Sequence, residues 1–122
     1  MRAQGIAELA YLGDAVFELL VRDMLLEMGV PFRDMNSSAQ GYVSAVAQSA
    51  MYHKIFDLLT EEEQSIMKRG RNLHGASRAK SAGVAEYRHA TGLEVLFGHL
   101  HHTGETSRLK EIFKLCIGEN TK

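Results

Sequence analysis

The stretch Leu9-Ala10-Tyr11-Leu12-Gly13-Asp14-Ala15-Val16-Phe17-Glu18 has a helical pattern but contains two residues that such a pattern usually excludes. Apolar residues recur at helical spacing through it and beyond it, which predicts one amphipathic helix over residues 5–28. A glycine inside a helix is less favourable than an alanine by about 1 kcal/mol. A carboxylate beside a buried face is also unfavourable unless it is hydrogen-bonded or binds a cation. Because Gly13 and Asp14 break both rules together, we interpret this position as a candidate functional site.

The size and composition of the chain are those of an ordinary globular protein. It has 122 residues, of which 45% are hydrophobic and 24% are charged, and this predicts one domain over residues 1–122. The single cysteine, Cys116, cannot form an internal disulfide, and we interpret it as a small buried residue. No apolar run approaches the ~20 residues that span a bilayer, and no signal-peptide pattern is present. We therefore expect a protein of the cytoplasm that does not act at a membrane.

Cap and turn residues divide the chain into five expected helices, and no β pattern or internal repeat is found. Gly29 is a typical C-terminal cap for the first helix, and Pro31 prevents the continuation of that helix. The second helix is expected to end near Leu59. It should begin at one of three N-cap candidates, namely Asn36, Ser37 or Ser38.

The other three helices follow from two further signals. Thr60 and Glu63 have the spacing of a capping box, which predicts a third helix over residues 61–71. Residues 72–83 show no apolar period, so we expect a loop there that is long enough to suggest a function. A fourth helix should start near Val84 and end around residues 103–104, and a fifth should span residues 105–117. The predicted fold class is all-α.

The charge of the chain is unevenly distributed, although the net value is only −1. Residues 68–88 contain six basic residues and one acidic residue, which gives this segment a net charge of +5. Such a segment can bind a polyanion even in a protein that is not basic overall. The alternative is a solvated loop with ordinary surface charges. The basic residues are Lys68, Arg69, Arg71, Arg78, Lys80 and Arg88.

Two acidic residues, Asp14 and Glu94, each lie at the margin of an otherwise apolar helix face. If the fold brought them together, they would form a hard oxygen site suited to Mg²⁺, which keeps most of its ligands as water. A bound water could then be activated for hydrolysis. The residues alone favour a simpler alternative, in which each acid pairs with an arginine such as Arg22 or Arg88.

Five ordered stretches of the chain resemble the ribonuclease III domain. Tyr11-Leu12-Gly13-Asp14-Ala15-Val16-Phe17 is similar to its Leu-Gly-Asp motif, and Glu94-Val95-Leu96-Phe97-Gly98 is similar to its second acidic motif. The other three stretches are Tyr42-Val43-Ser44-Ala45 with Gln48, Arg69-Gly70-Arg71-Asn72, and Tyr87-Arg88 leading into Thr91. The resemblance is strongest to Mini-ribonuclease III, the short bacterial branch that has no double-stranded-RNA-binding domain.

This resemblance implies a ribonuclease III-type helical bundle that forms a homodimer and hydrolyses double-stranded RNA with Mg²⁺ and a water nucleophile. It implies that Asp14 and Glu94 are the catalytic residues and the metal ligands, and that Gly13 allows close helix contact near the dimer interface. The implied substrate is the precursor of large-subunit (23S) ribosomal RNA, with a ribosomal protein as a candidate partner and no role for DNA. The residues implied in RNA binding are Lys68, Arg69, Arg71, Asn72, Arg78, Lys80 and Arg88.

Two positions depart from the pattern of full-length ribonuclease III. Ala10 stands where larger relatives have a glutamate one turn before the aspartate, and Thr91 stands where they have an acid before the final glutamate. The same departures are typical of the short branch, and they imply a low affinity for metal without RNA. They also motivate an alternative function, namely a catalytically weak or inactive dimer that binds RNA or the ribosome with the same fold.

Overall fold

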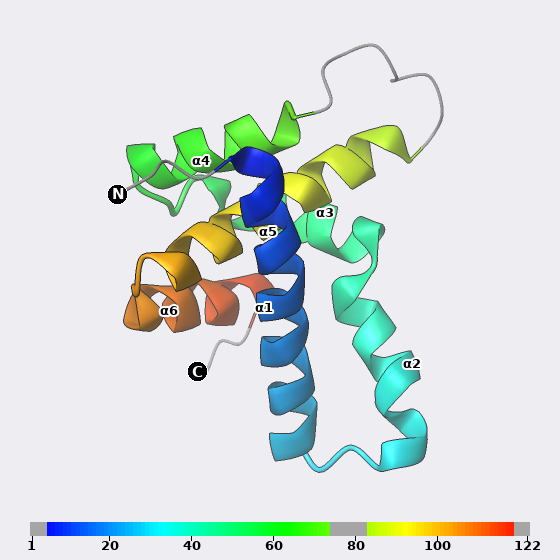
Figure 1. Ribbon diagram of the computed structural model, residues 1–122. Coiled ribbons are helices and arrows are strands. Elements are labelled where there is room, and N and C mark those ends of the chain that lie inside the picture. The colour runs from blue at the N-terminus through cyan, green and yellow to red at the C-terminus, as the bar shows by residue number, and fades with distance from the viewer. Residues whose placement is uncertain (1–4, 74–82, 119–122) are drawn as a thin grey trace.

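The structure, a computed structural model, describes residues 5–73 and 83–118. Within these ranges the chain forms only helices, and Figure 1 shows their arrangement. The helices are α1 (Ile6–Glu27), α2 (Phe32–Val43), α3 (Ala45–Phe56), α4 (Glu61–Arg71), α5 (Val84–His102) and α6 (Thr106–Ile117). The predicted all-α class is therefore confirmed. None of these helices is both long and apolar enough to cross a membrane.

The predicted second helix is wrong, because the chain forms two helices in this region. Pro31 follows the end of α1 and is the N-cap of α2, which therefore begins before the predicted caps Asn36, Ser37 and Ser38. Proline suits this position because the start of a helix needs no N–H donor from it. At Ser44 the backbone becomes extended, with φ −66° and ψ 158°, and the Ser44 hydroxyl accepts a hydrogen bond from the Ala47 N–H at 3.2 Å. Ser44 thus separates α2 from α3.

The cap predicted at Gly29 is confirmed. Gly29 has a φ of +77°, and its N–H donates to the Leu26 carbonyl at 3.1 Å. The N–H of Val30 donates to the Leu25 carbonyl, also at 3.1 Å. These two bonds form a Schellman motif, which satisfies the last carbonyls of α1 and turns the chain toward α2.

The core is built around α5, which contacts α1, α3, α4 and α6. In Figure 1, α1 crosses α5, while α2 extends along the far half of α1. Three aromatic rings from α1, α5 and α6 meet edge to face, with Phe17 5.2 Å from Phe97 and 5.8 Å from Phe113 between ring centroids. Phe17 and Phe97 are fully buried. Burial of such rings is a main source of stability.

Glycines allow α5 to contact two neighbouring helices through the backbone. A Cβ atom added to Gly13 would overlap the Glu94 carbonyl oxygen, and one added to Gly98 would overlap the Leu9 carbonyl oxygen. On the other side of α5, a Cβ atom on Gly70 would lie 2.8 Å from the Gly92 Cα. The close helix contact implied for Gly13 is therefore formed between α1 and α5 of one chain.

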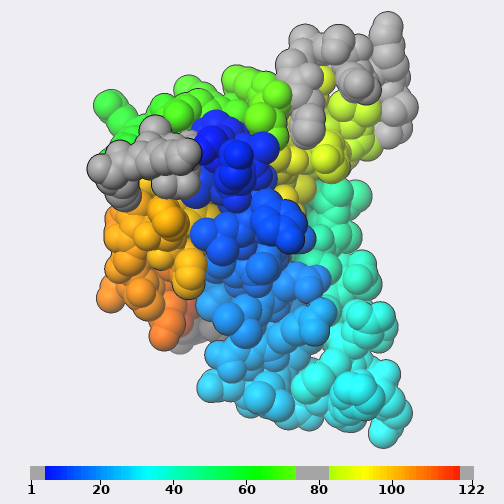
Figure 2. Space-filling model, viewed as in Figure 1, coloured from blue at the N-terminus to red at the C-terminus, as the bar shows by residue number. Residues whose placement is uncertain are grey.

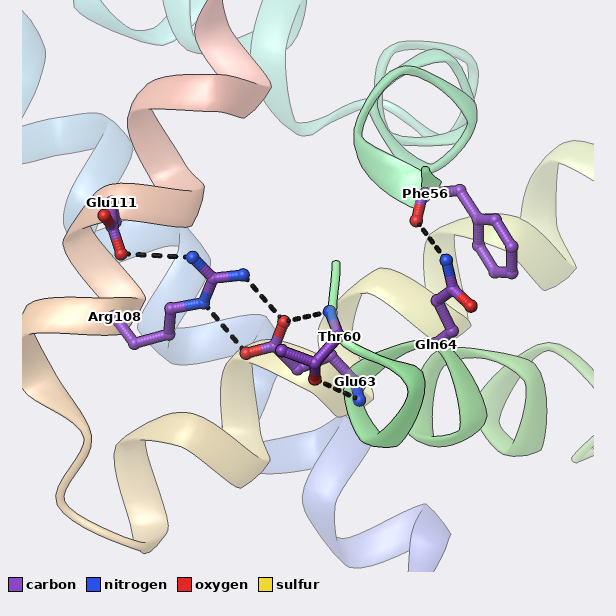
Figure 3. Close-up of polar contacts among 6 residues, drawn as sticks. All are labelled: Phe56, Thr60, Glu63, Gln64, Arg108 and Glu111. Atoms are coloured by element: carbon purple, nitrogen blue, oxygen red, sulfur yellow. Dashed lines mark hydrogen bonds and ion pairs between the residues drawn. The ribbon is translucent and has the colours of Figure 1, made fainter. Parts of the chain in front are cut away.

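A carboxylate at the start of α4 connects this helix to α6. The capping box is confirmed, because the Thr60 N–H donates to Glu63 Oε1 at 2.9 Å and the Glu63 N–H donates to Thr60 Oγ1 at 3.1 Å. Arg108 of α6 donates to both oxygens of the same carboxylate, at 2.8 and 2.9 Å (Figure 3). Above all through the hydrogen bonds of Arg108, the pKa of Glu63 is lowered below its usual range, although burial opposes the change.

Substitution of Gly13 tests the helix contact. Gly13→Ala should lower the free energy of unfolding by about 3 kcal/mol, because α1 must move away from α5 to make room for the methyl group. Gly41→Ala is the matched control, since Gly41 lies inside α2 with open space around it and alanine should stabilise the helix by about 1 kcal/mol. Urea unfolding of both variants measures the difference. Equal stabilities would contradict the account of this contact.

Substitution of Glu63 tests the connection between α4 and α6. Glu63→Gln should lower the free energy of unfolding at neutral pH by about 2 kcal/mol, because it removes the buried carboxylate that accepts two hydrogen bonds from Arg108 and leaves, among the described residues, only the exposed Glu111 as a charged acceptor. Since the pKa of Glu63 is lowered in the folded state, its stabilising effect is complete above the unfolded-state pKa and is lost as the pH falls through the folded-state pKa. The difference between wild type and variant should therefore shrink in acid. Glu62→Gln, an exposed residue of the same turn, should show no such trend.

Candidate active site

The two acidic residues singled out in the sequence share one pocket. Asp14 is exposed on α1 and Glu94 is half-buried on α5, and the backbone contact of Gly13 with Glu94 places them side by side. The pocket has a volume of about 300 Å³ and is open to solvent. It is lined by Ala7, Ala10, Tyr11, Asp14, Leu73, Tyr87, Thr91 and Glu94.

Asp14 and Glu94 interact with each other rather than with arginine. Burial raises the pKa of Glu94 to about 8, with further contributions from the charge of Asp14 and from a hydrogen bond between the two side chains. Arg22 pairs with Glu18 at 3.1 Å, and in the described part of the chain no lysine or arginine forms an ion pair with Asp14 or Glu94. The arginine-paired alternative is therefore wrong for Arg22 and Arg88, because Arg22 is paired with Glu18 and the contact of α1 with α5 brings Glu94 to Asp14.

Ala10 and Thr91, the two positions that depart from the pattern of larger relatives, also lie in this pocket. Ala10 lines it without a polar group, and the Thr91 hydroxyl donates to the Tyr87 carbonyl at 3.0 Å. No group of three or more histidine, cysteine or acidic side chains that could hold a metal is found in residues 5–73 and 83–118. Two carboxylates in an open pocket still fit Mg²⁺, because this ion keeps several waters and binds through one or two protein carboxylates together with substrate phosphates.

One end of the basic segment, at the end of α4, lies beside the pocket. Lys68 and Arg69 are exposed near the end of α4, and Lys68 lies over the Phe56 ring at 5.7 Å from its centroid. The half-buried Arg71 donates to the exposed Asn72 at 3.1 Å, and Leu73, which follows directly, lines the pocket. Figure 2 shows the first turns of α1 at the surface between α4 and the start of α5. The end of α4 therefore approaches the two acids.

Of the other three predicted RNA-binding residues, the structure describes one, Arg88. Arg88 is half-buried on α5, and its Nη2 atom makes no hydrogen bond to any described residue. Arg78 and Lys80 lie outside the described residues. The structure thus places four of the predicted residues at or near the end of α4, which are Lys68, Arg69, Arg71 and Asn72.

Sequence reasoning missed two aromatic residues of the pocket. Tyr11 is 85% exposed and Tyr87 is 53% exposed, and both line the pocket beside the acids. Their positions follow from helical spacing, because Tyr11 precedes Asp14 by three residues and Tyr87 precedes Thr91 by four. Once the acids were chosen, the same spacing would have identified both tyrosines.

The chain is similar to proteins of known families over most of its length. Residues 7–105 match a family model described as the ribonuclease III domain. The chain is 47% identical to a Mini-ribonuclease 3 of Symbiobacterium thermophilum, with 87% of this chain and 82% of that one covered. It is 37% identical to a Mini-ribonuclease 3-like protein of Ilyobacter polytropus, with 100% and 96% covered. A crystal structure of a protein from Fusobacterium nucleatum matches with a TM-score of 0.82 and 34% identity, covering 96% of this chain and 94% of that one.

Removal of the charge at position 14 tests the coupling of the two acids. Asp14→Asn should lower the pKa of Glu94 from about 8 toward its ordinary value, because the nearby negative charge is gone. Burial should still keep the pKa above that value. A carboxyl NMR titration of Glu94 in both proteins measures the change, and an unchanged pKa would show that the side chains do not face each other.

Proposed function

Because this chain belongs to the ribonuclease III domain family and is an endoribonuclease of the Mini-ribonuclease 3 type, we propose that it hydrolyses double-stranded RNA with Mg²⁺ at the Asp14–Glu94 pocket. One observation carries this proposal. Two carboxylates from helices that are far apart in the sequence meet in an open pocket with no ion-paired lysine or arginine among the described residues. Such an arrangement is unfavourable without a bound cation, and a divalent cation would neutralise it.

In the proposed mechanism Asp14 and Glu94 hold the metal ion from opposite helices. When bound, Mg²⁺ would activate a water and stabilise the negative charge that develops on the leaving 3′ oxygen. The close contact of Gly13 with the Glu94 backbone fixes the positions of the two carboxylates relative to each other. Little movement of these side chains should therefore accompany the reaction. Tyr11 and Tyr87 form the rim against which the RNA backbone would rest.

RNA binding is assigned to the basic segment beside the pocket. Duplex RNA presents mainly its phosphates and the shape of its minor groove, so positive side chains next to the scissile bond are suited to it. We propose that these contacts come from the residues predicted above, which are Lys68, Arg69, Arg71, Asn72, Arg78, Lys80 and Arg88.

The finer features of the proposal concern assembly and substrate. We propose a single domain, since one cluster of buried side chains includes residues of α1, α3, α4, α5 and α6.

We also propose a homodimer, in which each subunit cuts one strand. In its support, Leu19 and Leu26 of α1 are 67% and 65% exposed, and such apolar surface is typical of interfaces. The proposed substrate is a paired stem of the 23S ribosomal RNA precursor in the cytoplasm, with a ribosomal protein as a candidate partner.

Cleavage of a duplex RNA by variants of the acids tests the proposed function. Asp14→Asn and Glu94→Gln should each slow the Mg²⁺-dependent rate by at least about 100-fold, because the loss of a ligand removes several kcal/mol of transition-state stabilisation. Asp23→Asn, an exposed acid elsewhere on α1, is the matched control and should cleave at the wild-type rate. Chelation of the metal should abolish cleavage by every protein.

Two outcomes would count against this assignment. Cleavage that persists in Asp14→Asn would place the reaction elsewhere. Wild-type protein that binds duplex RNA without cutting it would favour the alternative function, a catalytically weak or inactive dimer that binds RNA or the ribosome.

A further inference from the structure

A second polar cluster lies where α3, α4 and α5 meet, apart from the carboxylate pocket. We call it the histidine cluster, and it consists of Ser49, Tyr52, His53, Arg71 and His89. The His53 and His89 rings are 4.4 Å apart between centroids, and the Tyr52 ring lies 4.7 Å from that of His89. Ser49 Oγ and His89 Nδ1 are hydrogen-bonded at 3.3 Å. Tyr52 is buried at the base of the cluster, whereas His53 is exposed.

The charges around His89 are mostly positive. Burial lowers the pKa of His89, and the charges of His53 on α3 and Arg71 on α4 lower it further. The Ala85 backbone and the charge of Glu86, both on α5, oppose this change. Burial raises the pKa of Tyr52 against the effect of Arg71, so the phenol stays neutral and offers no negative charge. The cluster can therefore hold up to three positive charges, on His53, Arg71 and His89. The negative charge of Glu86 acts on His89 in the opposite direction.

The histidine cluster and the carboxylate pocket share no residue, but they are neighbours in the chain at two points. Arg71 belongs to the cluster and is hydrogen-bonded to Asn72, and the next residue, Leu73, lines the pocket. On α5, Tyr87 lines the pocket and His89 follows it by two residues, so the two side chains leave the helix on different sides. A nucleic acid strand can therefore contact both sites only by passing around the end of α4, where Arg71 and Leu73 lie.

We propose that the histidine cluster binds a backbone phosphate of the RNA substrate, with His53, His89 and Arg71 as the cationic donors and Ser49 as a neutral one. This inference rests on the proposed function, because it extends the RNA surface of the same protein. Protonated imidazole and guanidinium groups form strong hydrogen bonds to phosphate oxygens. A phosphate also removes the mutual repulsion of the three cations. Binding is therefore linked to proton uptake, and RNA affinity rises as the pH falls.

The direction of this pH dependence follows from the lowered pKa of His89 in the protein without RNA. The pKa of His89 lies below its ordinary value of about 6.5, so the ring is neutral at neutral pH without RNA. A bound phosphate raises this pKa again. If it rises by about one, the affinity changes by about tenfold across the titration. The effect should be complete at low pH, where His89 is protonated with and without RNA, and absent at a pH where His89 stays neutral even with RNA bound.

Binding of a short duplex RNA, measured with a metal chelator present to prevent cleavage, tests this proposal. Wild-type affinity should be about tenfold higher at about pH 5.5 than at about pH 8. His89→Gln should lose most of this difference, and His53→Gln should lose part of it. His101→Gln is the matched control, because His101 is an exposed residue at the other end of α5 and should keep the full difference. Circular dichroism checks that each variant is folded.

NMR titration of the histidine rings gives a second measurement that needs no variant. Duplex RNA should raise the pKa of His89, whereas inorganic phosphate at the same phosphate concentration should have little effect. An unchanged pKa with RNA, or equal pH dependence in wild type and His53→Gln, would overturn the proposal. Cleavage at about pH 8 with Mg²⁺, where the His89 ring is neutral, tests the proposed function separately. Intact cleavage with pH-independent binding would therefore reject the histidine cluster alone.

Discussion

The backbone contact between Gly13 of α1 and the Glu94 carbonyl of α5 is the constraint on which the rest of this structure depends. A side chain at position 13 would overlap that carbonyl, so the two helices can cross at this distance only with glycine. Gly98 repeats the contact further along α5, against the Leu9 carbonyl. The unfavourable glycine in the middle of α1 is thus explained by a helix contact, and the helix contact brings Asp14 to Glu94.

The same crossing explains how two carboxylates remain together despite their repulsion. Phe17 and Phe97 lie on the same two helices and are fully buried, with their rings 5.2 Å apart. Burial of such a side chain contributes about 2 kcal/mol, and an edge-to-face ring pair adds to it. The core therefore fixes the helices and the positions of the two acids, and burial of Glu94, together with the charge of Asp14, raises the pKa of Glu94. A pKa perturbed by burial and by a specific charged partner in a cleft is typical of a functional site.

Sequence reasoning succeeded where a signal is local and failed where it depends on distant contacts. Gly29 and the Thr60–Glu63 pair mark helix ends by their own hydrogen bonds, so these boundaries were predicted correctly. The break at Ser44 was missed, because Val43 and Ala45 on either side of it also fit a continuous helix. The meeting of Asp14 with Glu94 could not follow from spacing, and the family resemblance rather than the residues indicated it. His53 and His89 were not considered, since only the fold brings their rings together.

The most direct test of the central claim is the location of the metal ion. Crystals of the protein with duplex RNA and Mn²⁺ in place of Mg²⁺ would show the ion by its anomalous scattering. The account predicts one or more peaks in the pocket between Asp14 and Glu94, within coordination distance of both carboxylates, and no peak there in Asp14→Asn. Ordered RNA with no peak at these carboxylates, under conditions in which the protein cuts RNA, would contradict it.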